Sequence, residues 1–479
     1  MKKIICLLIV GLVVGCTNHF EELNTDQKNP ASVTGESLFN NGTERFHHIL
    51  NSASVNTNVF RLYAQYWAQT TYPEESQYQQ IQRNIPDNWY QRLYRDALKD
   101  LDEAKRLIAA QETNSQTAPI QKNKLAIIEI TEAHIYTTLV DLFGNVPYSE
   151  ALDFANPNPK YDDAKEIYYS EIDQLNQAIA NLEVSAPSFD PTSDLVNQGD
   201  TEMWLKSANS LKLRLAMRLA DVDPAKSKAM AESAVSSGVF NDVSENLSVE
   251  YTNNAPYTYP AYEDLVLSGR SDFVAANTIV EVMNDLDDPR RKYYFQENLG
   301  KGVFVGGIYG SGNAFTSFSS PGTRMYTANT PGINLSYSEV LFLMAEAAQR
   351  GYAVGGTVEE FYNMAITASI LEWGGTAAEA MAYLAQPDVA WDTASGDWRQ
   401  KLGLQKWLSL YNNGIEGWTT WRLLDFEGFK VPEGLTEEDI PNRLVYPVNE
   451  ATLNGANLTA AATAIGGDNV QSKIFWDVR

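Results

Sequence analysis

Cys16 is the residue whose type and position indicate the clearest chemistry in this chain. The positive head Met1–Lys3 precedes the apolar run Ile4–Val14, and Gly15 places a small residue directly before the cysteine. This layout is typical of a secretory signal peptide, and the run is shorter than the about 20 residues of a membrane span. In a bacterial lipobox, the cysteine at the cleavage site is acylated and becomes the new N-terminus. We therefore predict a lipoprotein signal peptide over 1–15 and lipidation of Cys16; the alternative is a plain signal peptide that ends at a cysteine.

The rest of the sequence lacks the usual catalytic and metal-binding patterns. Its four histidines form no HExxH pair, and the adjacent His47 and His48 would point about 100° apart on a helix. Cys6 leaves with the signal peptide, and no Gly-x-Ser-x-Gly elbow is present. We therefore expect no catalytic residue, no metal ligand and no cofactor. A structural calcium ion and a carboxylate pair for glycoside cleavage stay open, because both depend on spatial proximity.

Aromatic residues gather with amides, carboxylates and an arginine in two stretches of the chain. Sugar rings stack their C–H faces on aromatic side chains while their hydroxyls need polar partners, so this mixture favours a glycan site. Core packing is the alternative for each single residue, because aromatics bury well. For the group, we expect at least two or three to be exposed. The predicted ligand-binding residues are Trp67, Tyr72, Glu75, Tyr78 and Trp89 in the first stretch, and Tyr257, Tyr259, Tyr262 and Arg270 in the second.

The overall charge argues against one class of partner. The formal net charge is −25, from 61 acidic and 36 basic residues. An acidic surface does not favour binding of DNA, RNA or anionic lipid headgroups through a basic face. The 25 tyrosines exceed what a core usually takes, because each buried hydroxyl needs a partner. Some of them are therefore expected to face a ligand.

Helices with apolar stripes must position these residues. We predict a polar tether over 16–35 and one mainly α-helical domain over 36–479, with helical spacing through 36–110 and a loop-rich segment at 240–335. Paired helices suggest tetratricopeptide-like hairpins, although no clean period of about 34 residues is present. Strand-like runs, such as Gly302–Ile308 and Leu444–Pro447, are few and short. The other predicted helices are Ala118–Leu142, which stops at Gly144–Pro147, Tyr161–Leu182, Trp204–Leu219, Pro224–Ser236 with Asp223 as N-cap, Ala275–Leu286, Ser336–Arg350, Thr357–Trp373, Ala377–Leu384 and Trp398–Tyr411.

Short motifs spread over the whole mature chain resemble those of the SusD/RagB-type outer-membrane nutrient-binding lipoproteins of Bacteroidetes, in their shorter SusD-like branch. They occur in the order expected of that family. The motifs are Phe20–Asn24 after Cys16, Asn29–Pro30, Trp67–Gln69 with Tyr72, Asp141–Tyr148, Ala208–Arg214, Asp288–Arg290, Tyr337–Val340, Ala345–Ala348, Gly417–Trp418, Trp421–Arg422 and Pro441–Pro447.

This resemblance implies a fold, a cargo and a partner. The family has a single α-helical domain in which four tetratricopeptide-like hairpins scaffold a loop-rich half. It captures oligosaccharides, or peptides in some branches, and performs no catalysis. Its partner is a SusC-like TonB-dependent barrel transporter, over which the lipoprotein closes as a lid. By this resemblance, the chain is expected to be anchored to the outer membrane through the lipid on Cys16, facing the cell exterior, with no nucleic-acid partner.

Two functions of other classes stay open beside this one. They are a lipid-anchored glycosidase and a lipid-anchored periplasmic scaffold that holds assembly partners on its helix hairpins. Several of the matched motif residues are expected to serve the fold. We predict Arg214 and Arg422 to be buried ion-pair partners, and Trp418 and Trp421 to lie in the core.

Overall fold

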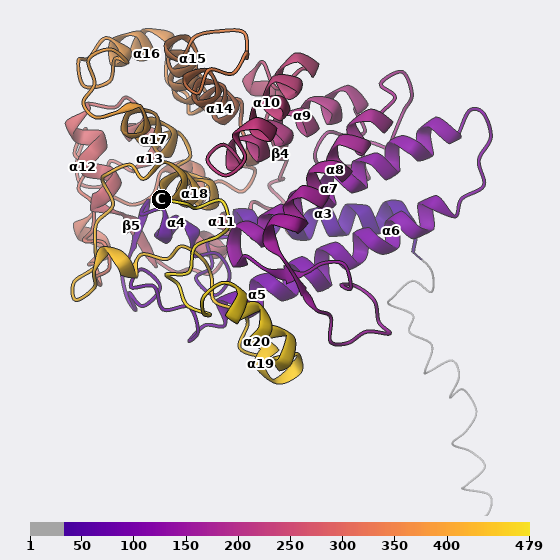
Figure 1. Cartoon of the computed structure of the whole chain (residues 1–479). Helices are drawn as coiled ribbons and strands as arrows, with labels where there is room; N and C mark the ends of the chain where they lie inside the picture. The colour runs from indigo at the N-terminus through magenta and orange to yellow at the C-terminus, as the bar shows by residue number, and fades with distance from the viewer. Residues whose placement is uncertain (1–32) are drawn as a thin grey trace, which may run out of the picture.

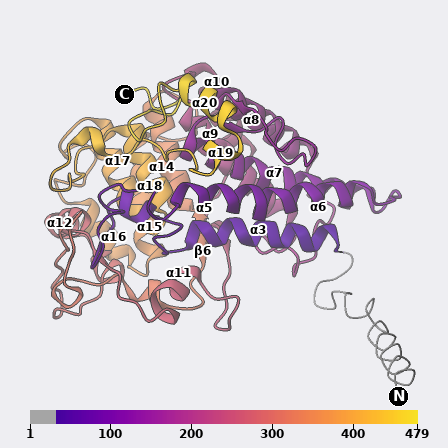
Figure 2. The same cartoon turned by 90° about the horizontal axis from the view of Figure 1, so that it is seen from below.

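Paired helices build most of the structure, a computed structural model that describes residues 33–479 (Figure 1). The pairs within the described residues are α3 (Gly35–Asn51) with α6 (Lys99–Ala109), α7 (Ala118–Phe143) with α8 (Ala164–Asn181), α9 (Thr201–Arg218) with α10 (Pro224–Ser237), and α14 (Tyr337–Gln349) with α15 (Val358–Glu372). Neighbouring pairs contact each other through α6 and α7, α8 and α9, and α9 and α14, and Figure 2 shows α3, α6 and α7 side by side. This arrangement confirms the predicted mainly α fold of helix hairpins.

The predicted signal peptide, the predicted lipidation site Cys16 and the part of the predicted tether up to residue 32 lie outside the described residues. The first helix of the described residues, α3, begins at Gly35 after Thr34, whose side chain accepts a hydrogen bond from the Ser37 N–H. Such N-caps satisfy amide groups that the helix itself leaves unpaired.

Capping residues and a glycine set the boundaries of several predicted helices. Asp223 caps α10, as predicted, and Pro224 occupies its first turn, where the missing N–H costs nothing. Thr357 and Glu360 form a reciprocal capping box at the start of α15. At the end of α7, Gly144 adopts φ +80°, a conformation that favours glycine and confirms the predicted stop.

Further helices pack beside α14 and α15. α16 (Ala377–Leu384) contacts α15, and α17 (Trp398–Ser409) contacts both α14 and α18 (Gly414–Leu424). α18 is not among the predicted helices, and glycines such as Gly414 and Gly417 are more typical of turns. Here they permit close approach: a Cβ at Gly414 would clash with the Phe60 backbone, and one at Gly417 with the Tyr66 hydroxyl. The last helices are α19 (Glu450–Leu453) and α20 (Gly455–Ala464).

Short elements replace long helices in residues 240–335, as the loop-rich prediction requires. The longest of them is α12 (Asn277–Asp285), with 9 residues. The other helical elements of this segment are α11 (Pro260–Tyr262), α13 (Arg291–Tyr294), the π-helix η3 (Glu263–Leu267) and the 3-10 turns η2 (Val243–Glu245), η4 (Phe315–Ser317) and η5 (Thr323–Tyr326).

The prediction of helical structure throughout 36–110 is wrong for residues 52–84. Only α4 (Phe60–Tyr63) and the strand β1 (Trp67–Gln69) interrupt the irregular backbone there. Helix resumes at α5 (Ile85–Gln91) and continues through the π-helical segment η1 (Arg92–Leu98) into α6. The irregular stretch contains several non-glycine residues with positive φ, which a regular helix does not accommodate.

The strands of the described residues form three antiparallel pairs. β1 pairs with β5 (Phe273–Ala275), β2 (Val146–Pro147) with β3 (Tyr161–Asp162), and β4 (Leu247–Val249) with β6 (Gly332–Leu335). The strand-like runs predicted at Gly302–Ile308 and Leu444–Pro447 are not strands. In the first, Gly307 makes one isolated bridge to Ala276, and the second follows an irregular path against other segments.

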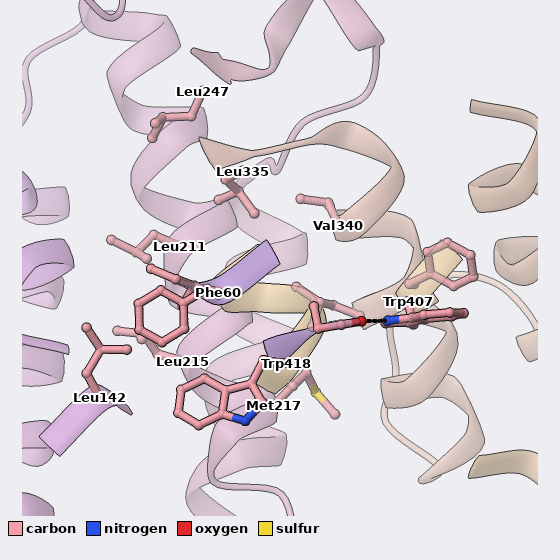
Figure 3. Packing of buried hydrophobic residues seen from close by; sticks show 14 of the residues in the cluster. Phe60, Leu142, Leu211, Leu215, Met217, Leu247, Leu335, Val340, Trp407 and Trp418 are labelled. Atoms are coloured by element: carbon pink, nitrogen blue, oxygen red, sulfur yellow. Dashed lines mark hydrogen bonds between the residues drawn. The ribbon is translucent and has the colours of Figure 1, made fainter. Parts of the chain in front are cut away.

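Trp407 and Trp418 lie in a hydrophobic core that joins the helix pairs to the irregular part (Figure 3). The Trp418 ring stacks on Phe60, with ring centroids 5.3 Å apart. Trp407 donates a hydrogen bond of 2.8 Å from its indole N–H to the carbonyl of Ala64, drawn as a dashed line in Figure 3. The core thereby fixes the segment after α4 against α17 and α18, and this segment carries the first predicted binding stretch.

A buried ion network links α9 to three other helices. Arg214 pairs with Glu339 of α14 at 2.7 Å, which confirms its predicted role. Arg218 pairs with Glu416 of α18 at 2.6 Å and with Asp141 of α7 at 3.2 Å. These pairs satisfy charges that would otherwise be costly to bury.

The prediction for Arg422 is wrong in its partner. Its guanidinium donates to the carbonyls of Asp141 and Asn442 and lies 3.6 Å from the centroid of the Trp418 ring. Arg422 is therefore held by backbone oxygens and a cation–π contact instead of an ion pair.

Candidate functional site

The three buried aromatics of the first predicted stretch belong to the core. Trp67 is 1% exposed and donates a 3.0 Å hydrogen bond to the Tyr411 hydroxyl, and Trp89 is fully buried with its N–H bonded to the carbonyl of Thr57. Tyr78 is also buried. A side chain without exposed surface cannot stack on a ligand, so the prediction is corrected for these residues: they support the surface that their neighbours form.

Glu75 is buried too, and it holds the loop from inside. One carboxylate oxygen accepts a 2.5 Å hydrogen bond from the Gln69 amide, and the other is in ion-pair contact with Arg83. Gln69 also donates to the carbonyl of Tyr72 at 2.9 Å. Glu75 therefore positions the Tyr72 loop and does not face a ligand, which corrects the prediction for this residue.

Tyr72 is exposed on this anchored loop, with 64% of its surface accessible. Its φ is +55°, and that of Tyr78 is +67°. Bulky residues rarely adopt such angles, and strained backbone of this kind clusters at functional sites. The loop thus holds an exposed aromatic ring in a costly conformation that its buried hydrogen bonds maintain.

Hydrogen bonds join the Tyr72 loop to two other segments of the irregular part. The Thr70 N–H donates to the carbonyl of Asp272 at 2.9 Å, next to the β1–β5 pair. The Gln77 side chain donates to the carbonyl of Gly310 at 2.8 Å. Segments far apart in the sequence therefore meet around Tyr72.

Arg270, predicted as a binding residue, lies at the same place. It forms a 2.5 Å ion pair with Asp272, and the hydrogen bond to Asp272 raises the pKa of Arg270, with a smaller contribution from the neighbouring Tyr72. Ile308, two residues before Gly310, is 58% exposed. We call the exposed side chains of Tyr72, Arg270 and Ile308 the Tyr72 surface.

The rest of the second predicted stretch lies elsewhere. Tyr259 is fully buried, and its hydroxyl donates to the Asn412 side chain at 3.1 Å while accepting from Arg61 at 3.4 Å. This burial corrects the prediction for Tyr259. Tyr262 is half-buried in α11, and Tyr257 is 65% exposed on a separate turn. Exposure of Tyr72, Tyr257 and Arg270 agrees with the expected two or three exposed members, whereas ligand contact by any of them stays a prediction.

A surface hollow lies beyond the C-terminal end of α18, outside the two predicted binding stretches. It consists of two adjoining spaces of about 400 Å³ and 250 Å³, which share Trp421, Asp425, Glu437 and Ile440 as lining residues. Trp421 is half-buried and packs against the hydrophobic core, so its predicted core position holds in part, and its ring stacks on Phe429 with centroids 5.1 Å apart. We call this hollow the Trp421 groove.

The electrostatics of the Trp421 groove differ from those of the Tyr72 surface. Burial and the nearby Asp477 raise the pKa of Asp425, against smaller opposing contributions from Lys473, Arg479 and Arg399. Burial also raises the pKa of Asp477. The mixture of Trp421, Phe429 and nearby carboxylates is the same signal that selected the two predicted stretches, and it could have identified this one.

A separate cavity between β6 and α17 is too small for a ligand. Its volume is about 30 Å³, the space of a single water molecule. Polar groups of Asn334, Glu372 and Asn413 line it. This cavity therefore fits a bridging water between buried polar groups.

Neither metal clusters nor membrane-crossing helices occur in the part of the chain that the structure describes. Nowhere in residues 33–479 do three His, Cys, Asp or Glu side chains gather closely enough to hold a metal ion. None of the helices there combines the length and the apolarity that crossing a membrane requires. Burial lowers the pKa of His47 to about 3 and that of His134 well below its usual value, so both are neutral core residues.

Comparison with known proteins gives a family match over most of the chain. Residues 27–447 match the model of the SusD-like family described as "Starch-binding associating with outer membrane". A search of curated protein sequences finds no match.

Solved structures share the fold at low sequence identity. A chitin-binding protein is 25% identical, with 93% of this chain and 100% of that chain covered and a TM-score of 0.77. A chitin-binding SusD homolog from Flavobacterium johnsoniae is 22% identical, with coverages of 91% and 99% and a TM-score of 0.78. A SusD-like protein from Bacteroides thetaiotaomicron is also 22% identical, with coverages of 93% and 99% and a TM-score of 0.77.

Proposed function

We propose that this chain, which belongs to the SusD-like family of starch-binding proteins associating with the outer membrane, captures oligosaccharides at the cell surface for uptake. The family match over residues 27–447 carries this proposal. A 25% identical relative with the same fold is a chitin-binding protein, which supports a glycan as the cargo. The family and its relatives bind carbohydrate, and we propose that this chain likewise acts by binding, without catalysis and without a cofactor.

The Tyr72 surface supplies chemistry that suits a sugar. The exposed Tyr72 ring offers a flat apolar face, and the neighbouring Arg270 offers N–H donors to ring hydroxyls. Buried hydrogen bonds from Gln69 and Glu75 hold the loop in place before a ligand arrives. Such preorganisation reduces the ordering cost of binding.

Location and partner complete the proposal. The lipid on Cys16 would anchor the protein to the outer membrane, with the helical domain facing the cell exterior. A SusC-like TonB-dependent barrel transporter would receive the glycan, and the protein would close over it as a lid. Co-purification of such a barrel from detergent-solubilised outer membranes tests this part, and its absence from the purified sample would contradict it.

Calorimetric titration of the purified mature protein with starch and chitin oligosaccharides tests the cargo. We expect a glycan to bind, and Tyr72→Ala to weaken that binding about tenfold, because an aromatic contact contributes about 1.5 kcal/mol. Phe154→Ala is a matched control, since Phe154 is also an aromatic residue and is 87% exposed elsewhere on the molecule. It should leave the affinity unchanged.

Three outcomes would favour the other functions. Binding of peptides and no glycan would assign the protein to the peptide-binding branch. Turnover of a bound glycan would establish a glycosidase. Protection from added protease in intact cells would place the chain on the periplasmic side and favour a scaffold.

A further inference from the structure

Carboxylates dominate the Trp421 groove. Asp425, Glu427, Glu437 and Glu438 line its two spaces. Within residues 33–479, no lysine, arginine or histidine nitrogen lies within the 4.0 Å ion-pair distance of these four carboxylates. None of the four therefore forms an ion pair within the described residues, although Lys473, Arg479 and Arg399 act on Asp425 at longer range.

The cations that line the groove already have partners. Lys473 pairs with Asp477 at 3.2 Å. Arg422 is 2% exposed, and its guanidinium donates to the carbonyls of Asp141 and Asn442. The groove thus presents a net negative surface although two basic residues belong to its lining.

An aromatic wall stands beside these carboxylates. Trp421 and Phe429 stack with an angle of 7° between their ring planes. Phe429 in turn packs edge-on against Phe426, with centroids 5.7 Å apart, and lies 6.0 Å from Trp407 of the core. The wall is therefore supported from behind, as an aromatic platform for a sugar ring requires.

We propose that the Trp421 groove binds a pyranose ring that carries a protonated amine, such as a glucosamine unit of an oligosaccharide. The ring would pack on Trp421, and the ammonium group would lie among Asp425, Glu437 and Glu438. This inference rests on the proposed function, because it names a class of glycan for the same protein.

Charge decides between this ligand and its alternatives. A neutral sugar could use the aromatic wall but would leave the carboxylates without a counter-charge, and an acidic sugar would be repelled. A protonated amine compensates the carboxylates and also interacts favourably with an aromatic face. Spaces of about 400 Å³ and 250 Å³ lie within the range of small-molecule sites or just below it, which suits a ring and its neighbours.

The test compares two oligosaccharides of equal length on the mature protein: fully deacetylated chitin oligosaccharide and its fully N-acetylated form. Calorimetry at about pH 6, where an amine carries its proton, measures both affinities. The double variant Asp425→Asn with Glu437→Gln removes two groove charges. Asn tolerates the left-handed backbone of Asp425, whose φ is +48°. The matched control is Glu433→Gln with Glu359→Gln, which removes two exposed charges that do not line the groove.

We expect the deacetylated form to bind about tenfold more tightly than the N-acetylated form, and the double groove variant to lose this preference. The control variant should retain it. Equal affinities for the two forms, or a preference that survives in the groove variant, would overturn the inference. So would equally tight binding of a lysine peptide of the same charge, because the groove would then select cations of any kind.

Failure of this inference is distinguishable from failure of the proposed function. Suppose that neutral glycans bind, that Tyr72→Ala weakens their binding, and that a protonated amine does not increase the affinity. The proposed function then stands, and the assignment of the Trp421 groove is wrong. If no glycan of either form binds, both fall.

Discussion

Glu171 of α8 is a buried carboxyl group whose protonation should control the pH dependence of stability. Its side chain is 1% exposed, and its Oε2 has no hydrogen-bond partner within the described residues. Burial raises the pKa of Glu171 to about 8, and Glu132 contributes in the same direction against a hydrogen bond from Tyr148. Lys105, the nearby cation, bonds to Glu132 at 3.0 Å.

The sign of the effect follows from proton linkage. Between the ordinary pKa of 4.5 and the folded pKa of about 8, the folded protein holds a proton on Glu171 that the unfolded chain has released. The free energy of unfolding therefore falls as pH rises through this window, by roughly 1.4 kcal/mol per pH unit. From about pH 5 to pH 8, this one group should lower stability by about 3 kcal/mol.

Glu171→Gln removes the titration and keeps the shape of the side chain. We expect the variant to become progressively more stable than the parent as pH rises from about 5 to 8. Urea unfolding followed by tryptophan fluorescence and circular dichroism at several pH values measures the difference. Glu166→Gln, at an exposed position of the same helix, should show no such trend. A constant difference between Glu171→Gln and the parent across this pH range would refute the reasoning.

Two further substitutions test the packing that supports the binding surfaces. Gly417→Ala should lower the free energy of unfolding by about 1 to 3 kcal/mol, because its methyl group meets the Tyr66 hydroxyl, whereas Gly455→Ala, at an open position, should be close to neutral in the same urea titration. Arg218→Met should cost about 3 to 5 kcal/mol, because it leaves Glu416 buried with one cation fewer; a melting temperature equal to that of the parent would contradict this role of the ion network.

The helical scaffold could be predicted because its signals are local. The Asp223–Pro224 pair starts α10, and Gly144 stops α7, and both effects depend only on neighbouring residues. The missed helix α18 shows the limit of such signals. Glycine is typical of turns, and only the packing of α18 on α4 and on Tyr66 explains Gly414 and Gly417 as points of close approach.

The candidate site was only partly predictable, because burial of an aromatic residue depends on distant partners. Trp67 is covered by Tyr411, which is 344 positions away in the sequence. Nothing in the local composition separates buried Trp67 from exposed Tyr72, five residues later. The motif around Trp421 predicts a core position because it indicates the fold, whereas the ring is half-buried and stacks on Phe429 of the following loop.

Hydrogen exchange of the mature protein, with and without a saturating oligosaccharide from the starch and chitin panel, tests the central claim most directly. If the protein captures glycan at the Tyr72 surface, amides of residues 69–78 and 266–273 should exchange more slowly in the presence of the sugar. Unchanged exchange in these segments, or protection confined to the helix pairs from α3 to α10, would contradict the account.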